Sequence, residues 1–394
     1  MNSTPGNSTT AGFRERLRDS GVSVLGHQDA SIRPAARWYG PPVAPNMAVS
    51  RTRATQVRGR HGQPGHHMTI EPLRAAHVSG PRDPARLADV DAVAVLAGLD
   101  HPRHGRLERS ERFVSGTHLH GRTTLNYRLY TPPGDVCTAR PLLVMLHAGE
   151  QGLQDFALSS QMNAAAGRLG WMVLYPEKPE RPGEQAGWSW YMYSHQQRGR
   201  GEPALLASLT RHVIAQHRID EQRVHVAGLS AGGAMAAVLG QTYPDLFASV
   251  GVHSGLPYGA VDDASGATSL KRYGRVDQEA CAGRPLRHGA PPTIVFHGTR
   301  DMTVHPSNGV RIYENAVSGR PGEHRFENGR EGGRAYTRRT HVAPDGHTNA
   351  ELWLIEGAGH AWSGGDPQGS QADWQGPAAS EQMLCFFMRH PASH

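Results

Sequence analysis

The feature that most constrains this chain is a serine with a glycine two residues away on either side, Gly228-Leu-Ser230-Ala-Gly232. An apolar run at residues 223–229 leads into the serine, and a helix-like segment follows at 231–239. A sharp turn from strand to helix strains the serine backbone, and only glycines at these two positions let strand and helix pass closely. A structural Gly/Ser turn is the alternative, but these flanking segments are the context that a nucleophile requires. We therefore predict that Ser230 is a nucleophile exposed above a sheet.

Strand-like and helix-like segments alternate from about residue 113 onward. Strands are predicted at residues 125–130, 141–147, 171–176, 223–229, 249–253, 293–298 and 351–357, and helices at 162–169, 205–217, 231–239, 308–316 and 381–389. Several of these strands are continuous apolar runs, which suits strands that are buried on both faces of a parallel sheet. The order predicts an α/β fold with a mainly parallel, doubly wound sheet flanked by helices, and ligand chemistry at the carboxyl ends of the strands.

A serine hydroxyl needs a base that removes its proton and a carboxylate that orients this base. Asp301 follows the predicted strand at 293–298, and His360 lies in a glycine-rich loop after the strand at 351–357. We predict a triad of Ser230, Asp301 and His360, although a turn-forming Asp301 and a metal-binding or solvated His360 are the alternatives. The residues that compete for these roles are Asp245, His253, His297 and His305. Two of them, His253 and His297, close strands and are expected to support loops.

The oxyanion of an acyl-transfer intermediate needs two N–H donors. One is predicted at Ala231, directly after the nucleophile, and the other in the loop after the strand at 141–147, where Ala148 and Gly149 are the candidates. We favour Gly149 because a residue without a Cβ lets the substrate approach the backbone closely. This chemistry needs no metal and no organic cofactor.

Two further groups of side chains lie near these segments. An aromatic set either lines the mouth of the site for an apolar acyl or polyester chain or packs under a long loop, and the sequence leaves both open: Trp188, Trp190, Tyr191 and Trp362. A charged set is expected to form a structural ion-pair network rather than to touch substrate: Arg198, Arg200 and Glu202.

The first part of the chain has a different composition. Residues 1–105 are rich in Arg, Pro, Gly, Ser and His and have only short apolar runs, so they could bury little core. We predict a largely disordered extension over 1–105, with one short helix at 84–99, followed by a catalytic domain at 106–392. The N-terminus lacks the charged start and apolar segment of a secretory signal, which predicts a cytoplasmic location. No apolar run is long enough to span a membrane, so no membrane partner is expected.

The net charge of +6 raises the question of nucleic-acid binding. The basic residues are almost all arginines, are spread along the chain, and form no cluster interleaved with aromatic residues, so we do not expect nucleic acid as a partner. Cys137, Cys281 and Cys385 can form at most one disulfide and contain no C-x-x-C pair.

Residues 113–390 resemble the polyhydroxybutyrate (PHB) depolymerase family of esterases, a branch of the α/β-hydrolases. The blocks that carry the resemblance include YRLYTPPG, PLLVMLH, VHVAGLSAGGAMAAVLGQTYPDLFASVGVHSG, PPTIVFHGTRDMTV, GGRAYTRR and GAGHAWSGG. The resemblance implies the α/β-hydrolase fold and a triad at Ser230, Asp301 and His360. It also implies hydrolysis of short-chain hydroxyacid esters, while related esterases act on acetyl or feruloyl groups of plant polysaccharide. Members of the family are often extracellular.

The chain departs from the family pattern around the predicted oxyanion loop. Relatives commonly read LHGC-x-Q and CWNWF where this chain has LHAGEQ and GWSWY, so Gly149 and Gly187 replace two cysteines and Ala148 replaces a glycine. The resemblance thus implies a lost disulfide between two loops, which would typically cost about 2–4 kcal/mol. We also expect the Cβ of Ala148 to disturb the oxyanion geometry and to weaken catalysis.

These observations together predict a serine esterase that acts on short-chain hydroxyalkanoate esters or oligomers. A carbohydrate esterase of the feruloyl or acetyl xylan type is the alternative within enzymes. A catalytically weak, binding-only hydrolase fold is the alternative of another class. The few residues after 390 are too short for a separate polymer-binding module, so the expected partners are small-molecule esters or dissolved oligoesters.

Overall fold

The computed structural model describes residues 113–133, 138–179, 187–274 and 291–392, which all belong to the second of the chain's two units, Val78–His394. The strands are β1 Phe113–His120, β2 Thr123–Tyr130, β3 Arg140–Leu146, β4 Met172–Pro176, β5 Ile219–Leu229, β6 Ser249–His253, β7 Thr293–Gly298, β8 Glu323–Glu331, β9 Arg334–Val342, β10 Thr348–Ile355, β11 Trp362–Ser363 and β12 Ala372–Asp373. The helices are α2 Leu153–Ser160, α3 Met162–Arg168, α4 Gly201–Gln216, α5 Ala231–Thr242, α6 Ala264–Tyr273, α7 Ser307–Val317 and α8 Ala379–Met388, with a 3-10 turn η1 at Tyr193–Gln196. The predicted extension at 1–105, its helix at 84–99 and the domain boundary near residue 106 lie outside the described residues, as do Cys137 and Cys281.

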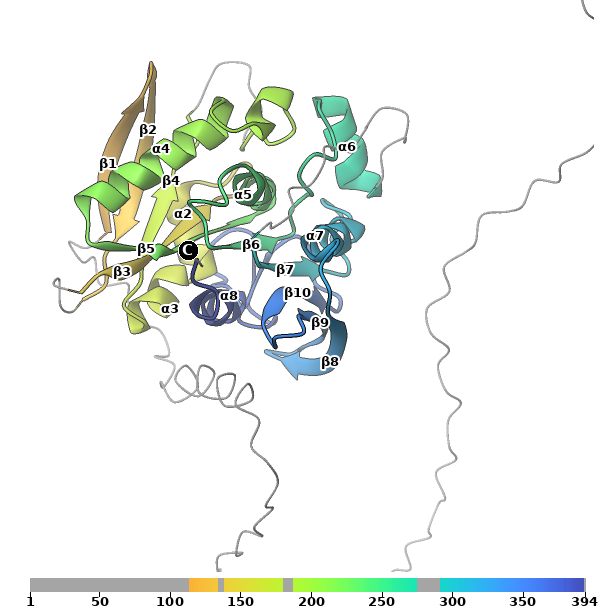
Figure 1. Ribbon diagram of the computed structural model, residues 1–394. Helices are drawn as coiled ribbons and strands as arrows, with labels where there is room; N and C mark the ends of the chain where they lie inside the picture. The colour runs from red at the N-terminus through yellow and green to blue at the C-terminus, as the bar shows by residue number, and fades with distance from the viewer. Residues whose placement is uncertain (1–112, 134–137, 180–186, 275–290, 393–394) are drawn as a thin grey trace, which may run out of the picture. The chain divides into compact units, whose positions relative to one another are not determined.

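Ten of these strands form one sheet in the order β1-β2-β4-β3-β5-β6-β7-β10-β9-β8 (Figure 1). The central strands from β4 to β10 pair in parallel, and antiparallel pairs of β2 with β4 and of β10 with β9 extend the sheet at its two ends. The predicted mainly parallel sheet is therefore confirmed at its centre. The strand order reverses at β3, because the chain runs outward to β4 and then returns to β5. A ligand site is expected at the carboxyl ends of β3 and β5, where such a reversal opens a crevice.

Helices cover both faces of the sheet, as Figure 1 shows for α5 and α7 on one side and α8 on the other. Apolar side chains of α4, α5, α6 and α7 pack in one core cluster, and those of α2, α3 and α8 pack in a second. The side chains of β5 point to both faces of the sheet, which is why two layers form. Val224 and Val226 enter the first cluster, and Ala227 and Leu229 enter the second. The doubly wound arrangement is confirmed. Among the described helices, none combines the length and apolar character that a membrane crossing needs.

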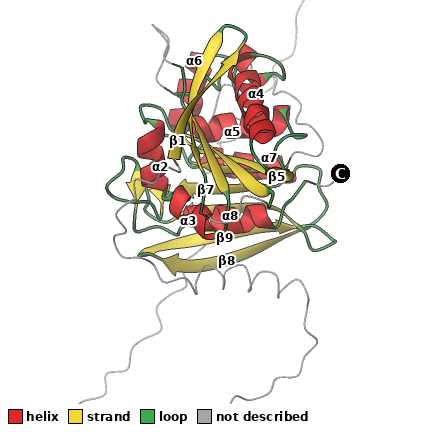
Figure 2. Ribbon diagram, turned by 90° about the vertical axis from the view of Figure 1, so that its left-hand side faces the viewer, coloured by secondary structure: helices red, strands yellow, loops and turns green. Residues whose placement is uncertain are grey.

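The sequence analysis missed β1, α2, α6 and the hairpin of β8 and β9. All residues of β8 are exposed or half-buried, so this edge strand has no apolar alternation to detect; Figure 2 shows it along the lower border of the sheet. Helix α4 begins at Gly201, four residues before the predicted start. Pro203 lies in its first turn, where a missing N–H costs no hydrogen bond, and it therefore does not prevent the helix from starting early.

Candidate active site

Ser230 lies at the turn between β5 and α5, as the sequence predicts, but only 6 % of the residue is exposed, so it is more enclosed than predicted. Its backbone has φ 57° and ψ −117°, a conformation that residues other than glycine rarely adopt, and its N–H donates to the carbonyl of His253 at 2.9 Å. The two flanking glycines are required by packing. A Cβ on Gly228 would meet the backbone of Gly232, and a Cβ on Gly232 would meet the carbonyl of Leu146 in β3. The strained turn is thus held between two strands and a helix.

The loops after β7 and β10 bring Asp301 and His360 together. Nδ1 of His360 donates to Oδ2 of Asp301 at 2.7 Å. Oδ1 of Asp301 accepts the N–H groups of Thr303 at 2.9 Å and Val304 at 2.8 Å, and Nε2 of His297 lies 3.3 Å from Oδ2. Because Asp301 accepts from Nδ1, a neutral His360 carries its proton there and keeps the lone pair of Nε2 for a second partner.

Asp301 remains ionised although only 4 % of the residue is exposed. Burial alone raises the pKa of a carboxyl group. Here burial is outweighed by the hydrogen bonds from His297, from His360 and from the N–H of Val304, which hold the pKa of Asp301 well below its usual range. A carboxylate that stays charged can orient a neutral imidazole and stabilise the imidazolium that forms from it.

Ser230 and His360 lie at the same edge of the sheet, because β5 and β10 belong to the parallel part of the sheet and both residues follow carboxyl ends. Within the described residues no hydrogen bond joins the hydroxyl of Ser230 to the ring of His360. In an enzyme without substrate this contact is often long, and it tightens in the substrate complex. The structure therefore joins Asp301 to His360 directly and places Ser230 at the same edge of the sheet.

The loop after β3 leaves one N–H available for an oxyanion. The N–H of Ala148 donates to Oε1 of Gln151 at 3.3 Å, and the carbonyl of Ala148 accepts Nδ1 of His147 at 2.8 Å. Since a trans peptide is planar, the N–H of Gly149 points away from that carbonyl. On the other side of the turn, the N–H of Ala231 is the first of α5, so no helix carbonyl is available to it. These contacts favour Gly149 over Ala148 as the second donor.

The side chain of Ala148 does not obstruct the site. The residue is 1 % exposed, packs in the second core cluster and does not have a positive φ. The expectation that its Cβ would disturb the oxyanion geometry is therefore wrong, because the Cβ is directed into the core. Gly149 is the half-buried residue of this loop that can face a substrate.

Gly149 and Gly187 are in contact. Gly187 has φ +91°, and a Cβ built on it would lie 2.7 Å from Cα of Gly149 and 3.3 Å from Cβ of Ala231. The two loops for which the resemblance implied a lost disulfide therefore touch at the two positions concerned. Backbone packing between these two glycines holds the two loops together here.

The aromatic set packs in the core. Trp188, Trp190 and Trp362 are 1 %, 3 % and 0 % exposed, so they do not line an open surface. Trp362 donates from Nε1 to Ser380 at 3.1 Å, and Trp188 packs beside the ring of His147. Of the two roles that the sequence left open for these three indoles, lining the site is contradicted and packing is confirmed, because each is enclosed by strands and loops. Tyr191 alone of the set is half-buried.

The residues that competed for the triad have other roles. Asp245 pairs with Arg198, and His305 pairs with a neighbouring serine hydroxyl. Nε2 of His297 donates to the carbonyl of Val304 at 2.9 Å. Nε2 of His253 accepts the N–H of Ser363 at 3.0 Å. Both histidines thus support loops, as predicted from their positions at strand ends.

The predicted charged network divides into separate contacts. Arg198 pairs with Asp245, whereas Glu202 accepts the N–H of Ser189 at 2.8 Å and lies 3.4 Å from Nδ1 of His195. Glu202 therefore holds the loop that contains Trp188 and Trp190. Arg200 is an exposed residue that precedes α4.

Two glutamines that the sequence analysis did not select hold the oxyanion loop. Gln151 is 5 % exposed and donates from Nε2 to the side chains of Asp155 and Ser159. Gln371 donates from Nε2 to the carbonyl of Gly149 at 3.4 Å. Gln151 matches the glutamine of the LHGC-x-Q pattern of relatives, so a signal for it existed. Gln371 lies more than 200 residues from Gly149 in the sequence, and no sequence pattern pointed to it.

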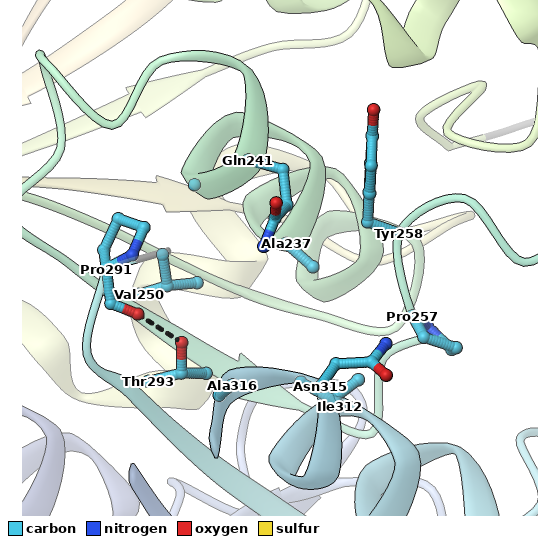
Figure 3. A pocket seen from close by; sticks show the side chains of 11 residues that line it. Ala237, Gln241, Val250, Pro257, Tyr258, Pro291, Thr293, Ile312, Asn315 and Ala316 are labelled. Carbon is cyan, nitrogen blue, oxygen red and sulfur yellow. Dashed lines mark hydrogen bonds between the residues drawn. The ribbon is translucent and has the colours of Figure 1, made fainter. Parts of the chain in front are cut away.

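A small pocket between α5 and α7 does not belong to this site (Figure 3). Its volume of about 30 Å³ holds about one water molecule. Its walls come from both helices and from the first residues of β6 and β7, and none of the predicted site residues lines it. The carboxyl edge of the sheet therefore remains the candidate site.

Part of this chain is similar in sequence to known esterases. Residues 125–317 match the sequence model of the family described as esterase PHB depolymerase, a range that includes Ser230 and Asp301 and ends before His360. Poly(3-hydroxyalkanoate) depolymerase C of Paucimonas lemoignei is 30% identical over 187 residues, which cover 45% of this chain and 44% of that protein. Feruloyl esterase B of Thermothelomyces thermophilus is 27% identical over 199 residues, covering 47% of this chain and 66% of that protein.

Acetylxylan esterase A of Emericella nidulans is 25% identical over 203 residues, covering 47% of this chain and 64% of that protein. The chain thus spans about half the length of the curated relatives it matches. Among solved structures, an acetyl xylan esterase from Aspergillus awamori matches with a TM-score of 0.48 at 18% identity, covering 67% of this chain and 94% of that one. The segment 125–317, with its doubly wound sheet and its nucleophile turn after β5, is thus similar to the PHB depolymerase family of esterases.

Proposed function

We propose that this protein is a serine carboxylesterase that works through an acyl-enzyme. The observation that carries the proposal is the 2.7 Å hydrogen bond between His360 and Asp301 at the same sheet edge as the strained turn of Ser230. A buried, ionised carboxylate on Nδ1 of a histidine makes Nε2 a base that can act on a serine hydroxyl. The relatives named above, all ester hydrolases by name, support the same reaction class.

In the proposed reaction, Oγ of Ser230 attacks the carbonyl carbon of an ester while Nε2 of His360 takes the hydroxyl proton. Asp301 stabilises the imidazolium, and the N–H groups of Ala231 and Gly149 receive the negative charge of the carbonyl oxygen. His360 then protonates the leaving alcohol. Water, deprotonated by His360, releases the acid in the second half of the cycle.

The proposed substrates are short-chain hydroxyalkanoate esters or oligomers. The 30% identical relative, a poly(3-hydroxyalkanoate) depolymerase, supports this class. Ala148 was the feature that favoured a binding-only fold, and its Cβ lies in the core, so no described feature now favours that alternative.

The direct test compares wild type with Ser230→Ala on p-nitrophenyl butyrate. We expect the variant to lose more than about 10⁴-fold in kcat, because the nucleophile and its base act as a unit. Arg330→Ala, at an exposed position of the edge strand β8, serves as a folded control. Equal background rates for wild type and Ser230→Ala would contradict the esterase proposal.

A second substrate class is favoured by one observation. A groove of about 730 Å³ runs between β1, β2 and the start of α2, which begins four residues after Gly149. Its lining is rich in polar side chains, among them Ser115, Thr117, Asn126 and Glu177. Hydroxyl and amide groups of this kind suit a hydroxyl-rich chain better than an apolar polyester. A carbohydrate ester is therefore our second candidate.

Rates on 3-hydroxybutyrate oligomers, methyl ferulate and acetylated xylo-oligosaccharides distinguish the two classes. A polyester-type enzyme should prefer the oligomers in kcat/KM, and Thr117→Val with Asn126→Leu should leave that value unchanged. A carbohydrate esterase should show the opposite preference, and the same two substitutions should raise KM for the xylo-oligosaccharide.

A further inference from the structure

We propose that His253 is a positioning residue that couples the nucleophile turn to the loop that carries His360. The inference rests on the proposed esterase function. His253 is the last residue of β6, the strand that lies between β5, which ends directly before Ser230, and β7, which leads to Asp301. It is therefore placed where the three segments of the predicted triad converge.

One residue makes both connections. The backbone carbonyl of His253 accepts the N–H of Ser230 at 2.9 Å, and its ring Nε2 accepts the N–H of Ser363 at 3.0 Å. Ser363 lies three residues beyond His360, in the short strand β11. A shift of His253 would thus move the serine and the histidine loop relative to each other.

The ring of His253 is fixed in one orientation and one protonation state. It is 1 % exposed and stacks on Phe296 at 5.8 Å and on Trp362 at 5.2 Å between ring centroids. Because Nε2 accepts, the proton lies on Nδ1, which faces the hydroxyl of Ser254 at 3.1 Å. The ring therefore cannot turn without losing two hydrogen bonds and two stacking contacts.

The charges around His253 keep its ring neutral. The titratable neighbours are His297, His360 and Asp301. Burial, followed by the repulsion of His297 and His360, lowers the pKa of His253 to about 3 against the opposing effect of Asp301. Nε2 of His253 therefore keeps its acceptor lone pair throughout the pH range in which a catalytic histidine is neutral and can act as a base.

The loop around His360 needs such an anchor. Gly357 and Gly364 flank His360 with φ +68° and φ +70°, so the backbone there is intrinsically permissive. The N–H of Ser363 bonded to His253 ties this loop to the rigid sheet. A displacement of about 1 Å in a catalytic group can cost about 10²-fold in rate.

The test replaces His253 by Phe, which keeps the ring and its stacking but removes the acceptor. We expect kcat on p-nitrophenyl butyrate to fall about 10- to 100-fold with KM changed less than about twofold. Acylation and deacylation should slow together, because His360 serves both steps.

The matched control is His225→Phe. His225 is equally buried, lies on neighbouring strand β5, and stacks on Trp171 and Phe387 instead of supporting a triad loop. It should lose stability but keep kcat per folded molecule. Wild-type kcat in folded His253→Phe, or equal losses of kcat in both variants, would overturn the inference.

If His253→Phe does not fold, His253→Gln and His253→Met decide the question. The amide of Gln can place an oxygen near the position of Nε2, whereas Met cannot accept an N–H strongly. Gln should retain at least about tenfold more kcat than Met, and equal values would overturn the inference. Ser230→Ala, measured alongside, shows whether a failure concerns the proposed function or only the inference about His253. If the wild type is no faster than Ser230→Ala, the proposed function is overturned, and the inference with it.

Discussion

The pKa of Asp301 is controlled by the hydrogen bonds that its carboxylate accepts. Its carboxylate accepts two backbone N–H groups on one oxygen and the ring of His360 on the other. These bonds outweigh the effect of burial on its pKa. The carboxylate is therefore charged over the whole range in which an esterase works, and in the proposed mechanism it orients His360.

Asp301→Asn should lower kcat about 10⁴-fold while the protein stays folded. The amide can donate to Nδ1 of His360, which would leave the ring proton on Nε2, where the base is needed. The measurement is kcat on p-nitrophenyl butyrate, with circular dichroism as the check on folding. Asp245→Asn, at a carboxylate paired with Arg198, is the control and should keep its activity.

Sequence reasoning identified the chemistry of individual residues better than their surroundings. Ser230, Asp301 and His360 each follow a readable apolar strand, so their common edge could be predicted. The burial of Trp188, Trp190 and Trp362 could not, because an indole that lines a cleft and an indole that fills a core have the same local pattern. Only the three-dimensional packing of their loops separates the two roles.

At the scale of elements, the loop after β3 and the loop before α4 form one unit. Their contact is made by Gly149 and Gly187, where any side chain on Gly187 would collide with backbone. The sequence pointed to this pair only through the cysteines of relatives, since a contact between two glycines leaves no local pattern. The hairpin of β8 and β9 escaped prediction for a related reason, because its exposed side chains show no periodicity.

Gly187→Ala should lower both kcat and the melting temperature. Its φ of +91° disfavours any Cβ, and this Cβ would lie 2.7 Å from Cα of Gly149 and force the oxyanion loop to move. Gly170→Ala is the matched control, since Gly170 has φ +74° but no heavy atom within 4 Å of a Cβ. Both variants should lose stability, and only Gly187→Ala should also lose kcat. Equal kcat in the two variants would contradict this account of the loop contact.

At the scale of the whole molecule, several buried histidines stay neutral, two of them in the sheet and one just after α8. Burial lowers the pKa of His225 to about 3, of His253 to about 3 and of His390 to about 4. In the unfolded chain the same groups titrate near the ordinary value of about 6.5. Between these values the unfolded chain binds more protons than the folded protein, so the free energy of unfolding falls as the pH falls.

We expect the free energy of unfolding to decrease steadily from about pH 6.5 toward pH 4. Urea titrations at pH 7, 6, 5 and 4 measure this slope. His225→Phe removes one of the three groups and should make the slope shallower, even though it lowers stability at pH 7. An unchanged slope in that variant would show that His225 does not contribute.

The turn at Ser230 has a consequence for how stability and activity are balanced in this protein. A serine at φ 57° and ψ −117° carries backbone strain of about 1–3 kcal/mol, which the unfolded chain does not have. Ser230→Gly should therefore be more stable than Ser230→Ala by about 1 kcal/mol in urea unfolding, while both lack esterase activity. If this difference is found, the nucleophile is a position at which selection for the reaction opposes selection for a stable fold. The strained serine then persists because the surrounding sheet has stability to spare.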